Sequence, residues 1–183
     1  MAARSPSGQV KCFPSARNHH ENQILVWSVI PSSIPDDVEE QAQQIARSIA
    51  EALELEGLLA VEMFLCADGS LLVNELAPRP HNSYHASERA CETSQFEQAI
   101  RAVCDLPLGD VAVVRPAAIA NLLGDLWLKD EPRFDLALGV PGVRLHLYEK
   151  HQPRTARKMG HLSATASTPD QAVASVLEAL GRL

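Results

Sequence analysis

The chain has 183 residues, of which 46% are hydrophobic and 21% are charged, so it can bury the core of one domain or of two small ones. Its formal net charge of -7 disfavours nucleic acid as a partner, because binding to a phosphate backbone usually requires a basic surface. No apolar run approaches the roughly 18 residues of a membrane span, and no signal-peptide pattern opens the chain. These features predict a cytoplasmic protein without a membrane partner.

The cysteine pattern agrees with that location. The four cysteines stand far apart, without a C-x-x-C pair, which predicts buried, reduced thiols rather than disulfides or a metal site.

Two strands and a long helix are predicted in the first third of the chain. Residues 9–14 and 24–30 are apolar and rich in β-formers, and the polar segment 15–22 between them is predicted to be a loop. Pro35 and the two acids after it open the helix, since proline suits the first turn and acids suit the positive end of the helix dipole. We expect Gly57 to end this helix. Its apolar stripe, predicted to be buried, consists of Val38, Ala42, Ile45, Ile49 and Leu53.

A hairpin follows the helix. Residues 58–65 and 71–76 are apolar runs, and the Asp68-Gly69 pair between them favours a two-residue turn. With that turn, Glu62 lies directly opposite Glu75 and both side chains share one face of the hairpin.

A short helix and a β-rich segment complete the chain. Ser94 is expected to cap the helix, which segment 106–109 ends. The apolar positions of that helix are Phe96, Ile100 and Val103. Strands are then predicted at residues 111–114, 117–123, 143–148 and 158–166. Thr168 caps a final helix whose apolar positions are Val173, Val176, Leu177 and Leu180.

The pattern as a whole predicts an α+β fold with two domains. The boundary is expected between residues 1–108 and residues 109–183, the second domain being the smaller, β-rich one.

The opposed pair Glu62 and Glu75 predicts chemistry, because like charges facing each other in apolar strands destabilise the sheet unless a proton or a cation lies between them. Mg²⁺ prefers oxygen ligands and keeps positions for water and phosphate oxygens, so a Mg-nucleotide site is one interpretation. The alternative is structural: one glutamate pairs with an arginine such as Arg79, and the other lies at a solvated strand edge.

Several motifs in family order make the chain resemble the 5-(carboxyamino)imidazole ribonucleotide synthases, which are ATP-grasp ligases of purine biosynthesis. The central block is Val61-Glu62-Met63-Phe64, Asn74-Glu75-Leu76-Ala77-Pro78-Arg79-Pro80-His81-Asn82-Ser83 and Thr93-Ser94-Gln95-Phe96-Glu97. Further matches are Asn18, His20, Leu106-Pro107-Leu108-Gly109, Asn121-Leu122-Leu123-Gly124-Asp125 and Arg157-Lys158-Met159-Gly160-His161.

The resemblance implies the carboxyl-terminal half of an ATP-grasp domain followed by a small β-rich domain. It implies ATP-dependent carboxylation of aminoimidazole ribonucleotide by bicarbonate through carboxyphosphate, with ATP and Mg²⁺ as cofactors and a homodimer as the assembly. Such enzymes carry an amino-terminal part that completes the ATP site, so we expect this chain to be a fragment that needs that part or a full-length chain as partner.

The resemblance also implies roles for particular residues. Glu62 and Glu75 match the family's Mg²⁺ ligands, and Asn74 stands beside them in the nucleotide site. Arg79 and His81 are implied in catalysis and substrate binding. The remaining residues implied in substrate binding are Asn82, Lys150, Arg157, Lys158 and, more weakly, His20. Lys150 and Arg157 match the positions that bind the ribonucleotide phosphate, and the adjacent cation Lys158 fits the same task.

Three departures and two alternatives qualify this prediction. Arg17 replaces a usual acid before Asn18 and Ala99 replaces a usual histidine after Gln98, so we expect altered contacts beside both. Tyr84 stands where the family has glycine, and tyrosine would resist a positive φ, so we expect an altered loop. Another ATP-grasp ligase, such as the formate-dependent glycinamide ribonucleotide transformylase, would carry similar metal acids. A non-catalytic binding or dimerisation remnant would retain the same residues without turnover.

Overall fold

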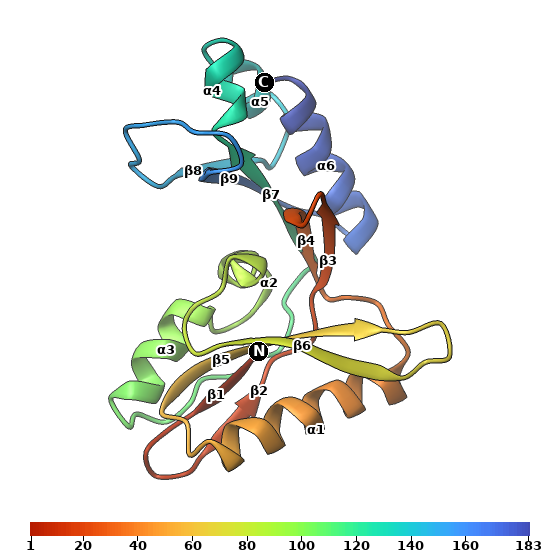
Figure 1. The fold of residues 1–183 in the computed structure, drawn as a ribbon, viewed down its shortest axis with the longest axis vertical. Coiled ribbons are helices and arrows are strands. Elements are labelled where there is room, and N and C mark those ends of the chain that lie inside the picture. The colour runs from red at the N-terminus through yellow and green to blue at the C-terminus, as the bar shows by residue number, and fades with distance from the viewer.

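The computed structural model describes residues 1–183, which form two lobes, each built on one antiparallel sheet (Figure 1). The smaller sheet has the strand order β2-β1-β5-β6 and comprises β1 (Ala2–Arg4), β2 (Val10–Cys12), β5 (Gly57–Leu65) and β6 (Leu71–Ala77). The larger has the order β3-β4-β7-β9-β8 and comprises β3 (Arg17–Glu21), β4 (Ile24–Ile30), β7 (Ala117–Leu123), β8 (Arg144–Leu147) and β9 (Lys158–Thr165). The predicted α+β class is confirmed.

Helices α1 (Asp36–Ala52) and α3 (Gln95–Val103) cover opposite faces of the smaller sheet. Neighbouring residues of a strand point to opposite faces, so Ala2 belongs to the core beneath α1 whereas Ala3 belongs to the core that includes α3. Small side chains at these contacts allow the helices to lie close to the strands.

The long helix α1 starts where the sequence predicts and differs from the prediction on its buried face. Val38 and Ala42 are buried as expected, Ile45 and Ile49 are half-buried, and Leu53, which follows the end of the helix at Ala52, is 58% exposed. The remaining buried positions of α1 are Ala46 and Ala50. Gly57 does not end the helix: it begins β5 with a positive φ of 120°.

The larger sheet is organised around β7, whose residues are buried almost throughout. On one face, α6 (Pro169–Gly181) and α5 (Phe134–Leu138) pack against it, and Thr168 caps α6 as predicted. The other face of β7 packs against the segment that contains the 3₁₀ turn η1 (Asn82–Tyr84) and α2 (Ser87–Ala90). The short helix α4 (Asp125–Lys129) follows β7.

Several sequence predictions are wrong. Segment 15–22 is not a loop, because residues 17–21 form the edge strand β3, and segment 111–114 contributes only an isolated bridge between Cys91 and Val113. Ser94 caps α3, but the apolar positions of α3 face outward, Phe96, Ile100 and Val103 being exposed. Strand β1 and the short helices α2, α4 and α5 were not predicted.

The four cysteines are free thiols, but not all are buried. Cys12 and Cys91 are buried as predicted, Cys66 is half-buried and Cys104 is exposed. None of the helices combines the length and the hydropathy that a membrane crossing requires.

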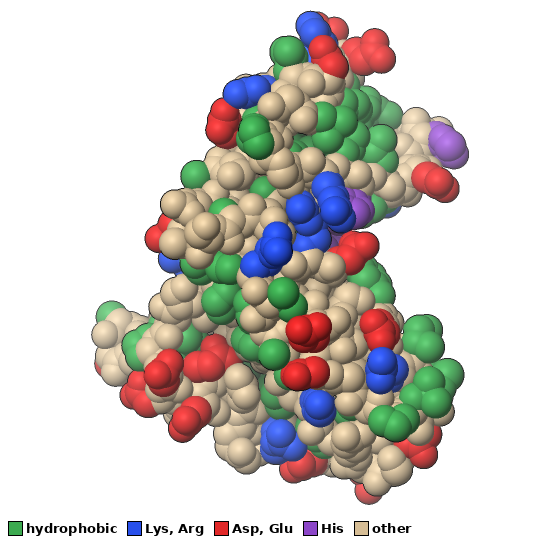
Figure 2. All heavy atoms as spheres, turned by 180° about the vertical axis from the view of Figure 1, so that it is seen from behind, with side chains coloured by type: hydrophobic (Ala, Val, Ile, Leu, Met, Phe, Trp, Pro, Cys, Tyr) green, Lys and Arg blue, Asp and Glu red, His purple; other side chains and the backbone are tan.

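The larger sheet joins parts of the chain that are far apart in sequence. Strand β4 pairs with β7 from Trp27 opposite Ala120 to Ile30 opposite Ala117. The sheet therefore takes strands from both sides of the boundary predicted at residues 108 and 109, which itself stays a prediction. In the space-filling view, Lys and Arg side chains gather near the narrow middle of the molecule, between the lobes (Figure 2).

Gly160 offers a test of this sheet, because it lies in β9 between β7 and β8. A Cβ there would overlap the carbonyl oxygen of His146, so we expect Gly160→Ala to destabilise the fold by about 2–3 kcal/mol in urea unfolding. Gly181→Ala is the control: nothing lies within 4 Å of its added Cβ, and its free energy of unfolding should change by less than about 0.5 kcal/mol. Equal effects of the two variants would contradict the packing.

Candidate functional site

The centre of the site is the carboxylate pair. Glu62 on β5 and Glu75 on β6 are ladder partners, as the hairpin predicts. The predicted two-residue turn is nevertheless wrong: residues 67–69 form a three-residue loop, and the ladder shifts by one residue after Glu62. Asn74 is the extra residue of this β-bulge, and the longer turn and the bulge cancel to give the expected pairing of the two acids.

The bulge also adds Asn74 to the polar side chains beside Glu62 and Glu75. Bulges re-aim side chains and are common beside active sites. Here Glu62, Asn74 and Glu75 all line one cleft of about 1330 Å³, although Asn74 and Glu75 are consecutive residues. The bulge therefore brings the side chain predicted for nucleotide contact to the same cleft as the two acids.

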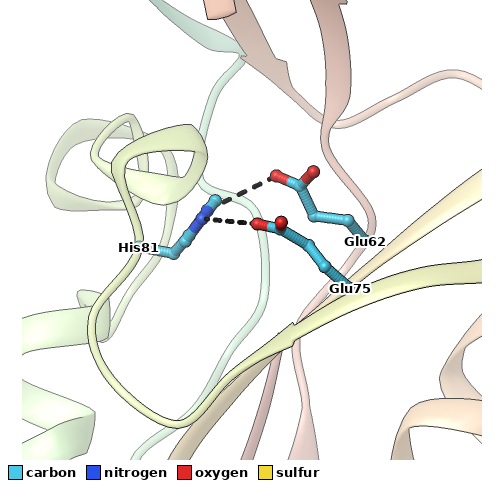
Figure 3. A group of neighbouring side chains, drawn as sticks. All are labelled: Glu62, Glu75 and His81. Atoms are coloured by element: carbon cyan, nitrogen blue, oxygen red, sulfur yellow. Dashed lines mark ion pairs between the residues drawn. The ribbon is translucent and has the colours of Figure 1, made fainter. Parts of the chain in front are cut away.

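His81 faces both carboxylates from the loop after β6 (Figure 3). Its Nδ1 lies 3.7 Å from Glu62 Oε1, and its Nε2 lies 3.9 Å from Glu75 Oε1. A closer contact of 2.7 Å joins Nδ1 to Ser83 Oγ. His81 is buried, Glu62 is nearly so, and the Glu75 side chain is 58% exposed, so the group opens to solvent on the side of Glu75.

The environment disfavours charge on both Glu62 and His81. Burial, and then the neighbouring Glu75, raise the pKa of Glu62, while His20 and Lys158 oppose the shift. Burial, followed by Arg79 and Lys158, lowers the pKa of His81. The imidazole is therefore neutral at neutral pH, and its contacts with the two acids are not those of a charged ion pair.

The donor set fits a divalent cation. One ligand atom from each of Glu62, Glu75 and His81 lies within 4.8 Å of the others. Two carboxylates supply the oxygen ligands that Mg²⁺ prefers and leave positions for water and phosphate. A cation between the acids would also remove the repulsion that raises the pKa of Glu62. The structural alternative, in which Arg79 neutralises one of the acids, has no such ion pair to support it.

Three of the predicted basic residues lie around the same cleft. Lys150, Lys158 and His20 contribute to its lining. Burial lowers the pKa of the Lys158 ammonium, which Glu62 and Glu75 partly counter. Lys150 is exposed and donates to the carbonyl of Lys158 over 2.7 Å, which ties the two lysines together at the mouth of the cleft.

Other predicted residues lie outside the lining of the cleft. Arg79 is exposed and donates one hydrogen bond to Pro80 O, which leaves its other donors free. Arg157 is half-buried and donates to Gln152 O within its own loop. Arg157 thus does not line the cleft together with Lys150 and Lys158.

Asn82 turns away from the carboxylates toward the larger sheet. Its amide pairs with that of Asn121 through two hydrogen bonds of 2.9 and 2.8 Å, and it also donates to Tyr148 OH over 3.3 Å. Tyr148 OH in turn lies 2.8 Å from His161 Nδ1. Asn82 therefore ties its loop to the larger sheet.

A stack of rings beside this network was not predicted. The rings of His85 and His161 have centroids 5.0 Å apart, and those of His146 and His161 are 4.5 Å apart. Phe96 stacks on the outer side of His85. Burial and the neighbouring histidines lower the pKa of His161 to about 3 and that of His85 to about 4, so both rings are neutral at neutral pH. No local pattern signals a stack whose members come from four separate segments of the chain.

The expected difficulty at Tyr84 does not arise. Tyr84 lies in η1 and is not among the residues with positive φ. Its ring is buried against Phe13 with centroids 5.2 Å apart, and its hydroxyl donates to Pro14 O over 2.6 Å. Tyrosine is accommodated here as a core residue.

Two family profiles match the chain. The ATP-grasp domain matches residues 1–96, and the phosphoribosylaminoimidazole carboxylase C-terminal domain matches residues 117–175. The chain belongs to the ATP-grasp family. This confirms the resemblance and places the second match in the half of the chain that was predicted to be β-rich.

Similar proteins within this family include several N5-carboxyaminoimidazole ribonucleotide synthases. The N5-carboxyaminoimidazole ribonucleotide synthase of Bacillus subtilis is 44% identical over 173 residues, which are 93% of this chain and 44% of that protein. A solved ADP complex of such a synthetase has a TM-score of 0.90 and 42% identity, covering 98% of this chain and 47% of that one. The Aspergillus clavatus synthase, solved with ADP and 5-aminoimidazole ribonucleotide, has a TM-score of 0.89 and 30% identity, covering 98% of this chain and 49% of that one. The chain thus spans about half the length of these ATP-grasp relatives.

The raised pKa of Glu62 predicts how stability depends on pH. Above the usual Glu pKa of 4.5, the unfolded state ionises this carboxyl more readily than the folded state, so stability is lost as pH rises through that region. Glu62→Gln carries no ionisable group at this position, so its stability is not lowered by the charge on Glu62. We expect the variant to be more stable than the wild type at pH 7 by up to about 1 kcal/mol.

The measurement is urea unfolding of both proteins from pH 4 to pH 8. The gain should shrink as pH falls through 4.5, because Glu62 then becomes protonated in the unfolded state as well. Glu40→Gln, an exposed change on α1, should show no such pH-dependent gain. A Glu62→Gln variant that is less stable than the wild type at pH 7 would contradict the repulsion.

Proposed function

We propose that this chain forms the metal-binding and ribonucleotide-binding part of an N5-carboxyaminoimidazole ribonucleotide synthase. The reaction is the ATP-dependent carboxylation of 5-aminoimidazole ribonucleotide with bicarbonate. The observation that carries the proposal is the grouping of Glu62, Glu75 and His81 in one cleft with two lysines, in a chain that resembles these synthases over nearly its whole length.

In this proposal, Glu62 and Glu75 hold Mg²⁺ with the nucleotide phosphates, and Asn74 contacts the nucleotide beside them. When bound, the cation would neutralise charge that develops as phosphate is transferred. Carboxylates rather than the imidazole are the ligands, because Mg²⁺ strongly prefers oxygen.

His81 is proposed to meet the reacting groups through Nε2. Its Nδ1 is engaged by Ser83, so Nε2 is the nitrogen left to orient a substrate or to move a proton. A neutral ring can do either, because one nitrogen donates and the other accepts. Arg79 is proposed to bind the bicarbonate-derived group, since its guanidinium keeps free donors that suit a planar anion.

Lys150 and Lys158 are proposed to bind the ribonucleotide phosphate, with Arg157 joining them when that anion is present. His20 is a further contact from β3, and Asn82 serves by fixing the loop. The proposal extends to the cytoplasm as location, to a homodimer as assembly, and to the amino-terminal part of the synthase as the partner that completes the ATP site.

Calorimetric titration tests the function directly. The chain is titrated with aminoimidazole ribonucleotide and with Mg-ATP, alone and then mixed with the amino-terminal part of a relative, and phosphate release is followed in the mixture. Ribonucleotide binding by the chain, with bicarbonate-dependent phosphate release on mixing, is the expected result. A folded chain that binds neither ligand, alone or mixed, would favour a non-catalytic remnant, and phosphate release that depends on formate and glycinamide ribonucleotide would favour the transformylase.

The phosphate-binding role of Lys150 has its own test. Lys150→Gln should weaken ribonucleotide binding by about tenfold or more, because it removes a charge-assisted contact to the phosphate. Lys129→Gln, at the exposed end of α4, is the matched control and should leave the affinity unchanged. An unchanged affinity in Lys150→Gln would remove this lysine from the proposed site.

Metal binding is tested with Mn²⁺, whose electron spin resonance signal reports the bound fraction. Glu75→Gln should weaken binding by at least about tenfold, because even the outer-shell partners of a bound metal typically contribute that much. Glu40→Gln should bind as the wild type does. Equal Mn²⁺ affinity in Glu75→Gln and the wild type would contradict a metal held by the carboxylate pair.

A further inference from the structure

Gln95, the first residue of α3, carries a side chain with no exposed surface. Burying a primary amide is costly unless its donors and acceptor find partners. Here each of them does: the amide oxygen accepts one hydrogen bond, and the amide nitrogen contacts two acceptors. These hydrogen bonds offset the cost of burying the Gln95 amide.

The principal partner of the Gln95 amide is the backbone of His81. Gln95 Oε1 accepts from His81 N over 2.8 Å, and Gln95 Nε2 donates to His81 O over 3.0 Å. The side chain thus pairs with both polar groups of one residue, as a neighbouring strand would. His81 N has no backbone acceptor, so without Gln95 this buried N–H would be unpaired.

The second donor of Gln95 Nε2 fixes a neighbouring ring. His85 Nδ1 lies 3.0 Å from Nε2, and it can accept a hydrogen bond only if the imidazole is neutral and carries its proton on Nε2. Burial lowers the pKa of His85 to about 4, which keeps that nitrogen available at neutral pH. One amide therefore holds both ends of the loop from His81 to His85.

We propose that Gln95 is a positioning residue that sets the placement of the His81 imidazole between Glu62 and Glu75. Gln95 touches none of the reacting groups and acts through the backbone of His81. The inference rests on the proposed function only for the importance of His81 in the reaction, because the placement itself is a property of the fold.

The same helix supplies a matched control. Gln98 is also fully buried, and its amide makes the same pair of bonds to one backbone residue: Oε1 accepts from Gly109 N over 2.8 Å, and Nε2 donates to Gly109 O over 3.1 Å. Gly109 is not part of the lining of the cleft. Substitution of Gln98 therefore costs the fold a similar pair of bonds without touching the loop of His81.

The test compares Gln95→Met with Gln98→Met by amide hydrogen exchange and by the ring signals of His81 in NMR spectra. In Gln95→Met we expect the His81 amide to exchange roughly tenfold faster or more, because its hydrogen bond is lost, and the His81 ring signals to shift. In Gln98→Met the Gly109 amide should lose protection while His81 stays as in the wild type. His81 signals that are unchanged in Gln95→Met, or changed equally by both variants, would overturn the proposal.

A second variant guards against misfolding of Gln95→Met. Gln95→Glu has the same shape and keeps an acceptor for His81 N. Its carboxyl has one donor when protonated and none when ionised, so at least one of the bonds to His81 O and His85 is lost. It should retain part of the amide protection and still shift the His81 ring signals, and full retention of the wild-type ring signals would overturn the proposal.

Added Mn²⁺ separates this inference from the proposed function. In the wild-type chain, bound Mn²⁺ should broaden the ring signals of His81, and the broadening should weaken in Gln95→Met but not in Gln98→Met. Absence of broadening in the wild type would count against the metal site, while the amide exchange would still decide the role of Gln95.

Discussion

The pairing of β4 with β7 is the constraint on which the rest of the molecule depends. It joins a strand that ends at Ile30 to one that begins at Ala117. The pairing thereby fixes the position of the β5–β6 hairpin relative to the β8–β9 loop. The alanines of β7 make this possible, because small side chains let α6 pack closely on one face while the His81–Ala90 segment packs on the other. The cleft with its acids and lysines exists because these two parts are brought together.

Much of the fold could be predicted because its signals are local. Pro35 and the acids after it mark the start of α1, the Thr168 cap marks the start of α6, and the pairing of Glu62 with Glu75 follows from the hairpin. That pairing was obtained through two errors that cancel, since neither the three-residue turn nor the bulge at Asn74 has a clear sequence signal. Strand β3 was missed because an exposed edge strand of polar residues has the composition of a loop.

Some residues of the candidate site could be named from the sequence, because their chemistry is recognisable in short motifs. Acids, lysines and a histidine carry recognisable chemistry, so Glu62, Glu75, His81 and Lys158 could be named from their residue types and their motif. The groups that hold them in place could not, because their partners are distant in sequence. Asn82 meets Tyr148 across 66 positions, and a buried glutamine such as Gln95 shows its role only when the backbone that it pairs with is visible.

The outward apolar face of α3 has a consequence for the behaviour of the chain in solution. Phe96, Ile100 and Val103 lie one turn apart along the helix and are exposed, although helix amphipathicity normally turns such a stripe inward. Contiguous apolar surface favours association. We therefore expect the state of the chain to depend on its concentration, so that affinities measured in dilute samples describe the single molecule, and those measured at high concentration also include contacts between copies.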